Sequence, residues 1–374
     1  MIKGVHLTLM IGPAVPVPVP QSVMSALKSV EVTSSKDRSG FQITFSVSKT
    51  SPLLTTMLPA GYFDPMVTRV IIIATTNGFP NVLMDGMVTR QQLVPSNEPG
   101  QSTLTITGDD LSVVMDVVEM PFMRYPAMPS IAQIYMILAK YAVFGIVPLA
   151  IPPFLTDVKP PTSKIDTQTG TDLSYLRKKA NNHGYVFYVE PGPLPGQSIA
   201  YWGPDIRIPV PQPALNVNMD AHTNVESINF SLDGLAKKIV VVTVYDPVTK
   251  KIPLAVPVPN FNMFKPPLGA RPTIPAKVEF PGFAKENPVS ATNRILGILA
   301  RSSDAISVSG SLDVLRYGRI LRSRMIVGVR GAGLAYDGLY YVNSVTHNIK
   351  SGEYKQNFQL SRDGLISNTP KVPI

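Results

Sequence analysis

The chain has 374 residues, 44 % of them hydrophobic and only 16 % charged, a composition that excludes extensive disorder and allows two or three domains. The 37 prolines, about twice the usual share, exclude long uninterrupted helices, and the absence of cysteine excludes disulfides, thiolate metal sites and a cysteine nucleophile. The net charge of +9 allows binding to nucleic acid or an anionic surface, but the basic residues are dispersed apart from short groups at 177–179 and 316–324, so we interpret them as a solvated basic surface.

The first part of the chain is predicted to consist of strands. Residues 1–12 contain an apolar run without a clear small-residue cleavage site, which favours a first strand and an extended proline arm over a signal peptide. Residues 41–47 alternate between apolar and polar side chains, and the polar turn at 36–40 pairs them with residues 30–33 as a hairpin. Further short strands are expected at 67–75, 82–90 and 102–107, and this series favours a barrel or a sandwich.

Helical patterns follow these strands. Asp109 and Asp110 predict the cap of a helix with residues 111, 114, 115 and 118 turned inward. Ser130 and Gln133 form a capping-box pattern that opens a second helix, which carries Ile131, Ile134, Tyr135 and Leu138 and has Gly145 near its end. Because Gln133, Lys140 and several prolines interrupt the apolar stretch at 131–155, it predicts a soluble helix and an extended segment rather than a membrane span.

A third helix is expected to begin at Thr171 or Asp172 and to end at Gly184, before a strand at 185–189. Residues 116–210 are therefore predicted to be a small α+β insertion. Strand character returns at 215–230 and 238–245. A proline-rich excursion and a short helix near 291–300 come next, and four last strands follow at 305–312, 320–329, 338–349 and 353–362.

Catalysis and metal binding require titratable side chains that converge. The four histidines, His6, His183, His222 and His347, lie far apart in the sequence and in no metal-ligand spacing. Each is interpreted as a surface or hydrogen-bonded structural residue, with a half-buried role for His347. Asp109 and Asp110 are expected to cap a helix rather than to act as an acid pair. The Asp-Gly pairs that begin at Asp85, Asp337 and Asp363 are expected to be turns.

Other conspicuous residues also have structural interpretations. The sequence GVRGAG at 328–333 lacks the spacing and the following helix of a phosphate-binding loop, so a strand end and a turn are expected. Trp202 could anchor a ligand or an interface, but a packed aromatic bordering a turn is favoured. Tyr340 and Tyr341 are expected to place one ring on each face of a strand rather than to stack on nucleobases. We therefore predict no catalytic, cofactor-binding or metal-binding residues, and no enzyme activity.

Three segments carry a resemblance to a known family. Residues 338–347, GLYYVNSVTH, and 352–364, GEYKQNFQLSRDG, look like a hairpin with a G-Y-V-V-x-H strand followed by a G-x-x-x-Q-x-F-x-L strand. A helix-and-strand pattern is similar at Gln168, Asp172, Leu176, Ala180, Gly184 and Tyr185. The opening strand, the proline arm and the hairpin at 29–47 also fit. Over nearly its whole length, the chain resembles the baseplate hub proteins of contractile phage tails and contractile injection systems, the group that includes late control protein D.

The resemblance implies a mainly β fold with an α+β insertion, in which each chain has two tube-like β-barrel domains and smaller inserted domains. On this basis we expect residues 1–115 to form the first barrel, 116–210 the insertion, 211–245 strands returning to the barrel region, 246–290 a proline-rich excursion and 291–374 the second barrel. Fused family members continue into a spike, whereas only residues 365–374 follow the last strand here, so a separate spike protein is expected.

The implied function is structural. A homotrimeric ring would adapt a hexameric inner tube to a trimeric spike, with the inner tube protein, the spike protein and other baseplate proteins as partners. The resemblance implies no cofactor, no specific nucleic acid and no direct membrane span. The chain would be made in the cytoplasm without a signal peptide and built into the baseplate of a phage tail or injection particle.

Two other classes of protein stay open. One is a tail-tip protein that binds or hydrolyses the cell wall; peptidoglycan turnover lost on changing Asp109 or Asp110 would favour it, and the lack of a convergent acid pair argues against it. The other is a nucleic-acid-binding protein; binding that weakens steeply with salt would favour it, and the lack of a basic stripe argues against it.

Overall fold

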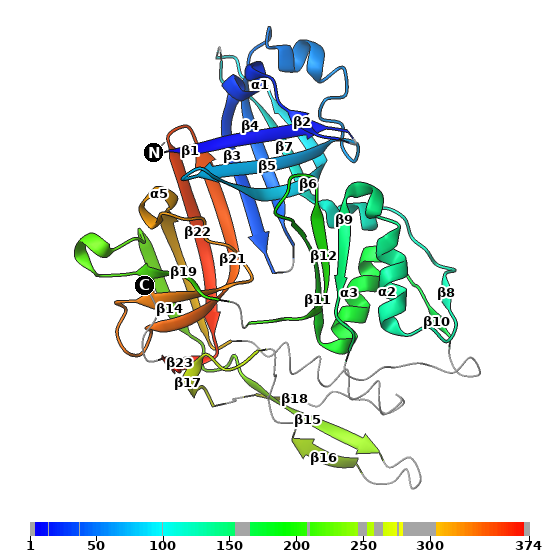
Figure 1. Cartoon of the computed structure of the whole chain (residues 1–374), viewed down its shortest axis with the longest axis vertical. Coiled ribbons are helices and arrows are strands. Elements are labelled where there is room, and N and C mark those ends of the chain that lie inside the picture. The colour runs from blue at the N-terminus through cyan, green and yellow to red at the C-terminus, as the bar shows by residue number, and fades with distance from the viewer. Residues whose placement is uncertain are drawn as a thin grey trace.

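The computed structural model describes residues 4–13, 15–36, 38–98, 100–153, 165–207, 210–245, 253–257, 265–274, 277–279 and 304–369. Within these residues a large β-sheet forms the main body, and a unit containing two helices lies beside it (Figure 1).

Strands from both ends of the chain build the main sheet. Across the described residues it has thirteen strands in the order β14-β19-β22-β21-β3-β4-β7-β6-β5-β1-β2, with β20 pairing to β21 and β13 to β20. The strands are β1 (Val5–Gly12), β2 (Val17–Pro18), β3 (Leu27–Ser35), β4 (Gly40–Val47), β5 (Arg69–Thr76), β6 (Phe79–Val94), β7 (Ser102–Asp110), β13 (Gln212–Asn216), β14 (Ser227–Leu232), β19 (Ile306–Asp313), β20 (Ile326–Arg330), β21 (Gly338–Lys350) and β22 (Glu353–Arg362). Strands β3 and β21 pair antiparallel, so the first and last strand regions share one ladder.

Alternating side chains give this sheet one apolar face. In β4, Phe41, Ile43, Phe45 and Val47 are buried, whereas the residues between them face outward. The expected hairpin is confirmed, because β3 and β4 pair antiparallel with Val30 opposite Ile43. A single hydrophobic cluster contains side chains from both strand regions, so the two regions are stabilised by the same core.

The α+β insertion has a separate core. Helices α2 (Ser130–Ala139) and α3 (Asp172–His183) cover a sheet of β11 (Tyr185–Pro191), β12 (Ser198–Pro204) and β9 (Ile146–Ala150), and β8 (Arg124–Tyr125) pairs with β10 (Asp166–Thr167) (Figure 1). Helix α3 begins where the Thr171 hydroxyl accepts from the Ser174 amide and ends at Gly184, whose φ is 69°, as predicted. The fold class is therefore confirmed as mainly β with an α+β insertion, and the domain boundaries stay a prediction.

Two predicted helices begin where expected but differ in detail. Asp110 does cap a turn, but this turn is the short 3-10 helix η2 (Leu111–Met115), and Val118 lies exposed beyond it. The N-cap of α2 is Pro129, and no side chain caps it. Gln133 instead donates to the Met128 carbonyl and accepts from the Tyr175 hydroxyl, because packing against α3 outweighs the local capping pattern.

The second half also departs from its predicted pattern. The expected strand at 215–230 is divided into β13 and β14 by η4 (Asp220–His222), and the strand expected from residue 320 begins at Ile326. The helix expected near 291–300 and most of the excursion at 246–290 lie outside the described residues. Among the described helices, none has both the length and the apolar character needed to cross a membrane.

Smaller elements complete the description. They are the helices and turns α1 (Gln21–Ala26), η1 (Leu53–Met57), η3 (Ala142–Phe144) and α5 (Val314–Tyr317), a sheet of β15 (Lys238–Tyr245), β16 (Pro253–Pro257) and β18 (Lys277–Glu279), and the pair β17 (Gly269–Pro272) and β23 (Gly364–Ser367).

Candidate functional site

The structure does not bring the four histidines together. His6 lies on β1, His183 at the end of α3, His222 in η4 and His347 on β21. Within the described part of the chain, no group of three or more His, Asp or Glu side chains is placed to hold a metal ion.

His347 is more deeply buried than expected. Its Nδ1 lies 2.7 Å from the Tyr354 hydroxyl and 3.2 Å from the Gln356 side-chain amide. The Gln356 amide nitrogen can only donate, so Nδ1 accepts and the ring is the neutral tautomer with its proton on Nε2. Burial lowers the pKa of His347 to about 3, with a smaller contribution from Arg322. The interpretation of His347 as a structural residue therefore holds, although its side chain is fully buried rather than half-buried.

The acidic candidates have separate structural partners. The carboxylate of Asp109 accepts two hydrogen bonds from Arg38, at 3.0 and 2.7 Å. Asp110 accepts from the backbone amides of Ser112 and Ser39, at 2.8 and 3.1 Å. Both carboxylates are thus occupied by local contacts, and burial raises the pKa of Asp110.

One of the three expected Asp-Gly turns was wrong. Asp337 accepts from the Ala332 amide across a turn, and Asp363 accepts from the Leu268 and Gly269 amides. Asp85, however, lies within β6, where its buried carboxylate forms two 2.7 Å hydrogen bonds with Arg69. The ion-pair partner is 16 residues away in sequence, so the local Asp-Gly pattern gave no indication of it.

The aromatic residues take the structural roles that were expected. Trp202 is fully buried in the insertion core and donates to the Leu176 carbonyl at 3.3 Å. Tyr340 joins the main core, and Tyr341, the next residue along the strand, contacts Asp205 and Arg207 on the opposite face. The GVRGAG segment contains the end of β20 and a turn in which Gly331 and Gly333 have positive φ, as expected.

Trp202 gives a direct test of this packing, because it is the only tryptophan in the chain. We expect native fluorescence to be blue-shifted and protected from iodide quenching, since the indole is shielded from water. Steady-state fluorescence with and without iodide checks this. Strong quenching in the native protein would contradict the described packing, and the denatured protein serves as the accessible control.

Buried ion pairs connect the insertion to the main sheet. Arg69 on β5, besides binding Asp85, donates to the Gly196 carbonyl at 3.1 Å, next to β12. The Ser198 hydroxyl, on β12 itself, donates to Asp85 at 3.3 Å. These contacts hold one edge of the insertion against the first strand region.

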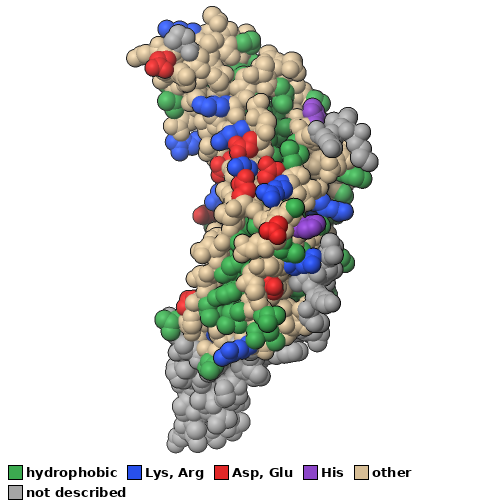
Figure 2. Space-filling model, turned by 90° about the vertical axis from the view of Figure 1, so that its left-hand side faces the viewer, with side chains coloured by type: hydrophobic (Ala, Val, Ile, Leu, Met, Phe, Trp, Pro, Cys, Tyr) green, Lys and Arg blue, Asp and Glu red, His purple; other side chains and the backbone are tan. Residues whose placement is uncertain are grey.

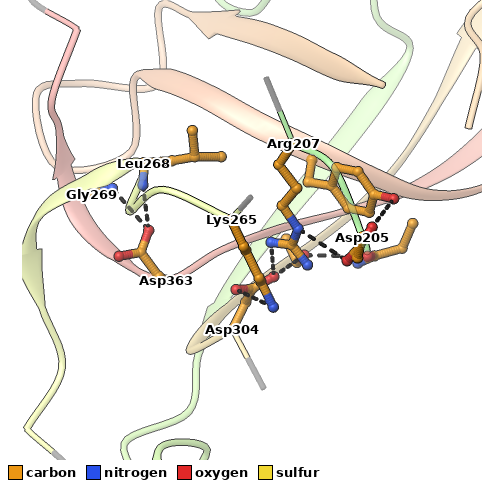
Figure 3. Close-up of polar contacts among 10 residues, drawn as sticks. Asp205, Arg207, Lys265, Leu268, Gly269, Asp304 and Asp363 are labelled. Atoms are coloured by element: carbon orange, nitrogen blue, oxygen red, sulfur yellow. Dashed lines mark hydrogen bonds and ion pairs between the residues drawn. The ribbon is translucent and has the colours of Figure 1, made fainter. Parts of the chain in front are cut away.

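We call Asp205, Arg207, Lys265, Asp304 and Tyr341 the junction cluster, of which Figure 3 labels the four charged residues. Arg207 binds Asp304 at 2.8 Å and Asp205 at 3.5 Å, and its guanidinium lies 4.2 Å from the centre of the Tyr341 ring. Lys265 approaches Asp304 to 3.7 Å. Burial alone would raise the pKa of Asp304, but Arg207 and Lys265 together lower it to about 2. This carboxylate is therefore held ionised, so it can bind cationic side chains but is a poor proton acceptor near neutral pH.

Arg324 makes a third connection. It precedes β20 with a φ of 61°, and its guanidinium lies 3.9 Å from the centre of the Tyr188 ring in β11. One nitrogen donates to the Ser35 carbonyl of β3, and another lies 3.4 Å from Glu190 of β11. Arg324 belongs to the second strand region, and its side chain therefore contacts both the insertion and the first strand region.

The expectation of a solvated basic surface was wrong for several arginines. Arg69, Arg207, Arg324 and Arg362 are buried. Arg69 and Arg324 find acceptors on segments distant in sequence, Arg362 binds carbonyls in neighbouring turns, and Arg207 binds the distant Asp304 more closely than the nearby Asp205. Only the pairing of the strands brings the partners together.

The outward face of the main sheet is polar and mostly uncharged. We call the following residues of β14, β19, β22 and β21 the polar sheet face: Ser227, Asn229, Ser309, Ser311, Asn357, Gln359, Ser344 and Thr346. They stand opposite one another across four strands and line a groove of about 460 Å³. Thr33, Gln42, Thr44 and Thr105 continue the pattern over β3, β4 and β7.

Charge is concentrated elsewhere. In the side view of Figure 2, most of the visible acidic side chains gather in one band across the middle of the molecule. An exception is Lys355 of β22, which lies on the outward face two residues before Asn357 and forms ion pairs with Glu226 at 3.0 Å and Glu353 at 3.2 Å. A sheet with one apolar face and one face of hydroxyl and amide groups is suited to lining a water-filled space or a polar interface.

The chain has the fold of phage tail proteins and of a type VI secretion component. No protein-family model matches the sequence, and no protein of curated function matches it. A tail protein from Neisseria meningitidis superposes with a TM-score of 0.62 and 13% identity, over 97% of this chain and 98% of that chain. The tail protein of prophage MuSo2 from Shewanella oneidensis gives 0.60 and 13%, over 97% and 100%. An E. coli component of the type VI secretion system gives 0.51 and 10%, over 93% and 78%. The resemblance drawn from the sequence is thus confirmed at the level of the fold.

Proposed function

We propose that the protein is a structural component of a contractile tail or injection machine, where it forms a homotrimeric baseplate hub between a hexameric inner tube and a separate trimeric spike. The observation that carries this proposal is the main sheet, in which two strand regions from opposite ends of the chain form one continuous wall. Three copies would supply six such regions, which allows a threefold ring to match a sixfold partner. The shared fold with tail proteins supports the same role.

The two faces of the main sheet suggest how the ring would be arranged. The apolar face is already buried in the core, which leaves the polar sheet face and the ends of the sheet for assembly. Among the described strands, β14 pairs only with β19 and lies at the end of the strand order, so its other edge could accept a neighbouring strand. We place the polar sheet face toward the passage of the ring, where uncharged hydroxyl and amide groups would stay hydrated.

We also propose that the protein acts without catalysis. Asp85, Asp109, Asp110 and Asp304 are each bound by arginine or by backbone amides, so none of these carboxylates is free to exchange a proton with a substrate. Synthesis in the cytoplasm and incorporation into a particle belong to the same proposal.

Ring formation is the direct test. Native mass spectrometry of the purified chain should give a trimer. With the inner tube protein and the spike protein of the same particle added, it should also give complexes of this trimer with both partners. Substituting proline at Ile228 in β14 should weaken the trimer if the edge of β14 is used, because the register turns the Ile228 amide away from β19 and proline removes that donor. A chain that stays monomeric at high concentration and binds neither partner would overturn the proposal.

A further inference from the structure

A cavity of about 700 Å³ lies where the insertion meets the main sheet. Its walls come from α3 and β11 of the insertion, from β19 and β21 of the main sheet, and from the junction cluster. Of the candidate residues drawn from the sequence, the cavity lining includes Tyr341 and two members of the basic groups, Arg177 and Arg324.

The described lining carries far more positive than negative charge. Its acidic side chains are Asp205 and Asp304, and its basic side chains are Lys36, Arg38, Arg177, Arg207, Lys265 and Arg324. Asp205 and Asp304 are already bound by Arg207 and Lys265. Asp109 and Glu190 approach Arg38 and Arg324 from outside the lining, and two paired cations do not cancel an excess of four. The described part of the lining therefore carries a net positive charge.

Lys265 is one of the buried cations of this lining. Burial lowers its pKa, and Arg207 and Lys36 lower it further, whereas Asp304 and Asp205 raise it. An anion entering the cavity would reduce the repulsion among Lys265, Arg207 and Lys36.

Arg324 has donor capacity that the protein does not use. Its side chain is only 8% exposed, and its Nε has no hydrogen-bond partner among the residues that the structure describes. Its contact with Glu190, at 3.4 Å, is long for a charge-assisted hydrogen bond. A buried guanidinium with an unused N–H is costly, and a small rotation toward an incoming oxyanion would satisfy it.

We propose that this cavity is a binding site for a polyvalent anion whose phosphate or carboxylate groups contact Arg324 and Lys36. The volume exceeds what a single phosphate ion needs, so a ligand with two or more charged groups fits better than inorganic phosphate. Guanidinium groups bind both oxyanions in a bidentate manner, so the chemistry is shared between phosphates and carboxylates.

Isothermal titration of the full chain with inorganic pyrophosphate, and separately with citrate, tests the site at ionic strength matched with sodium chloride. We expect saturable binding of at least one anion, and the preferred anion distinguishes phosphate from carboxylate ligands. Arg324→Gln and Lys36→Gln should each weaken binding roughly tenfold, the loss expected for one charged contact. Lys36 is exposed, so its substitution should not disturb the fold even if Arg324→Gln does.

Lys350→Gln is the matched control, because Lys350 is an exposed lysine at the end of β21 and is not part of the cavity lining. It should leave the affinity unchanged. Unsaturable binding to the wild type, or equal affinity in the wild type and in the Lys36→Gln variant, would overturn the proposal. The measurement uses the free chain and does not depend on ring formation, so its outcome is separate from that of the proposed hub.

Discussion

Asp85→Ala is expected to lower the free energy of unfolding by about 3–5 kcal/mol, because it leaves the Arg69 guanidinium buried without its counter-ion. The two side chains are 7% and 0% exposed, and together they also hold the Gly196 carbonyl and the Ser198 hydroxyl of the insertion. Urea denaturation followed by circular dichroism measures the loss. Trp202 fluorescence in the same samples shows whether the insertion core unfolds before the main sheet, because Trp202 is buried in that core.

A matched control lies on neighbouring strands. Arg38 and Asp109 form a similar two-point ion pair, but the Arg38 side chain is 66% exposed. Asp109→Ala should therefore cost no more than about 1 kcal/mol. Replacing both buried partners, with Arg69→Met and Asp85→Leu, should recover most of the stability that Asp85→Ala removes. Equal losses for Asp85→Ala and Asp109→Ala would show that the buried pair has no special role.

Acidification is expected to destabilise the protein through His347. The unfolded histidine titrates near 6.5 and the folded one near 3, so between these values the unfolded state binds the additional proton. Stability is therefore complete above pH 6.5 and is lost as the pH falls toward 3, at about one factor of ten in the folding equilibrium for each pH unit. The whole window corresponds to about 5 kcal/mol, and a drop to about pH 4.5 corresponds to about 3 kcal/mol.

The comparison that isolates this effect is the His347→Gln variant. Glutamine can still accept from Tyr354 and Gln356 but does not titrate, so its unfolding free energy should fall less steeply between pH 6.5 and 4.5. Asp304 contributes mainly below pH 4, since its pKa is about 2, and therefore lies outside this window. Parallel pH profiles for the two proteins would contradict the prediction. Urea denaturation across the pH range provides the measurement.

Features that depend on neighbouring residues could be predicted from the sequence. The alternation in β4 identified its buried face, and Thr171 and Gly184 marked both ends of α3. The turn at the GVRGAG segment was predicted for the same reason, since glycine is favoured at positive φ. In each case the physical cause acts within one strand, one helix or one turn.

Features that depend on distant pairing could not be predicted in this way. The partner of Asp85 lies on another strand, and that of Arg207 is 97 residues away, so neither local charge pattern indicates burial. The capping pattern at Ser130 failed because Tyr175, in a different helix, binds Gln133. The cavity is built from segments that only the completed fold brings together, and the similarity of fold was found at 13% identity or less in the structures compared.

The ladder between β3 and β21 also has a consequence for synthesis on the ribosome. Strand β3 emerges early, but its partner β21 begins at Gly338. The edge of β3 that pairs with β21 therefore stays unpaired until more than 300 further residues have been translated. Nascent chains that terminate prematurely would keep this edge open and would remain targets for chaperones and proteases. Only a chain that has been translated past Lys350 can therefore form this ladder and close its own sheet.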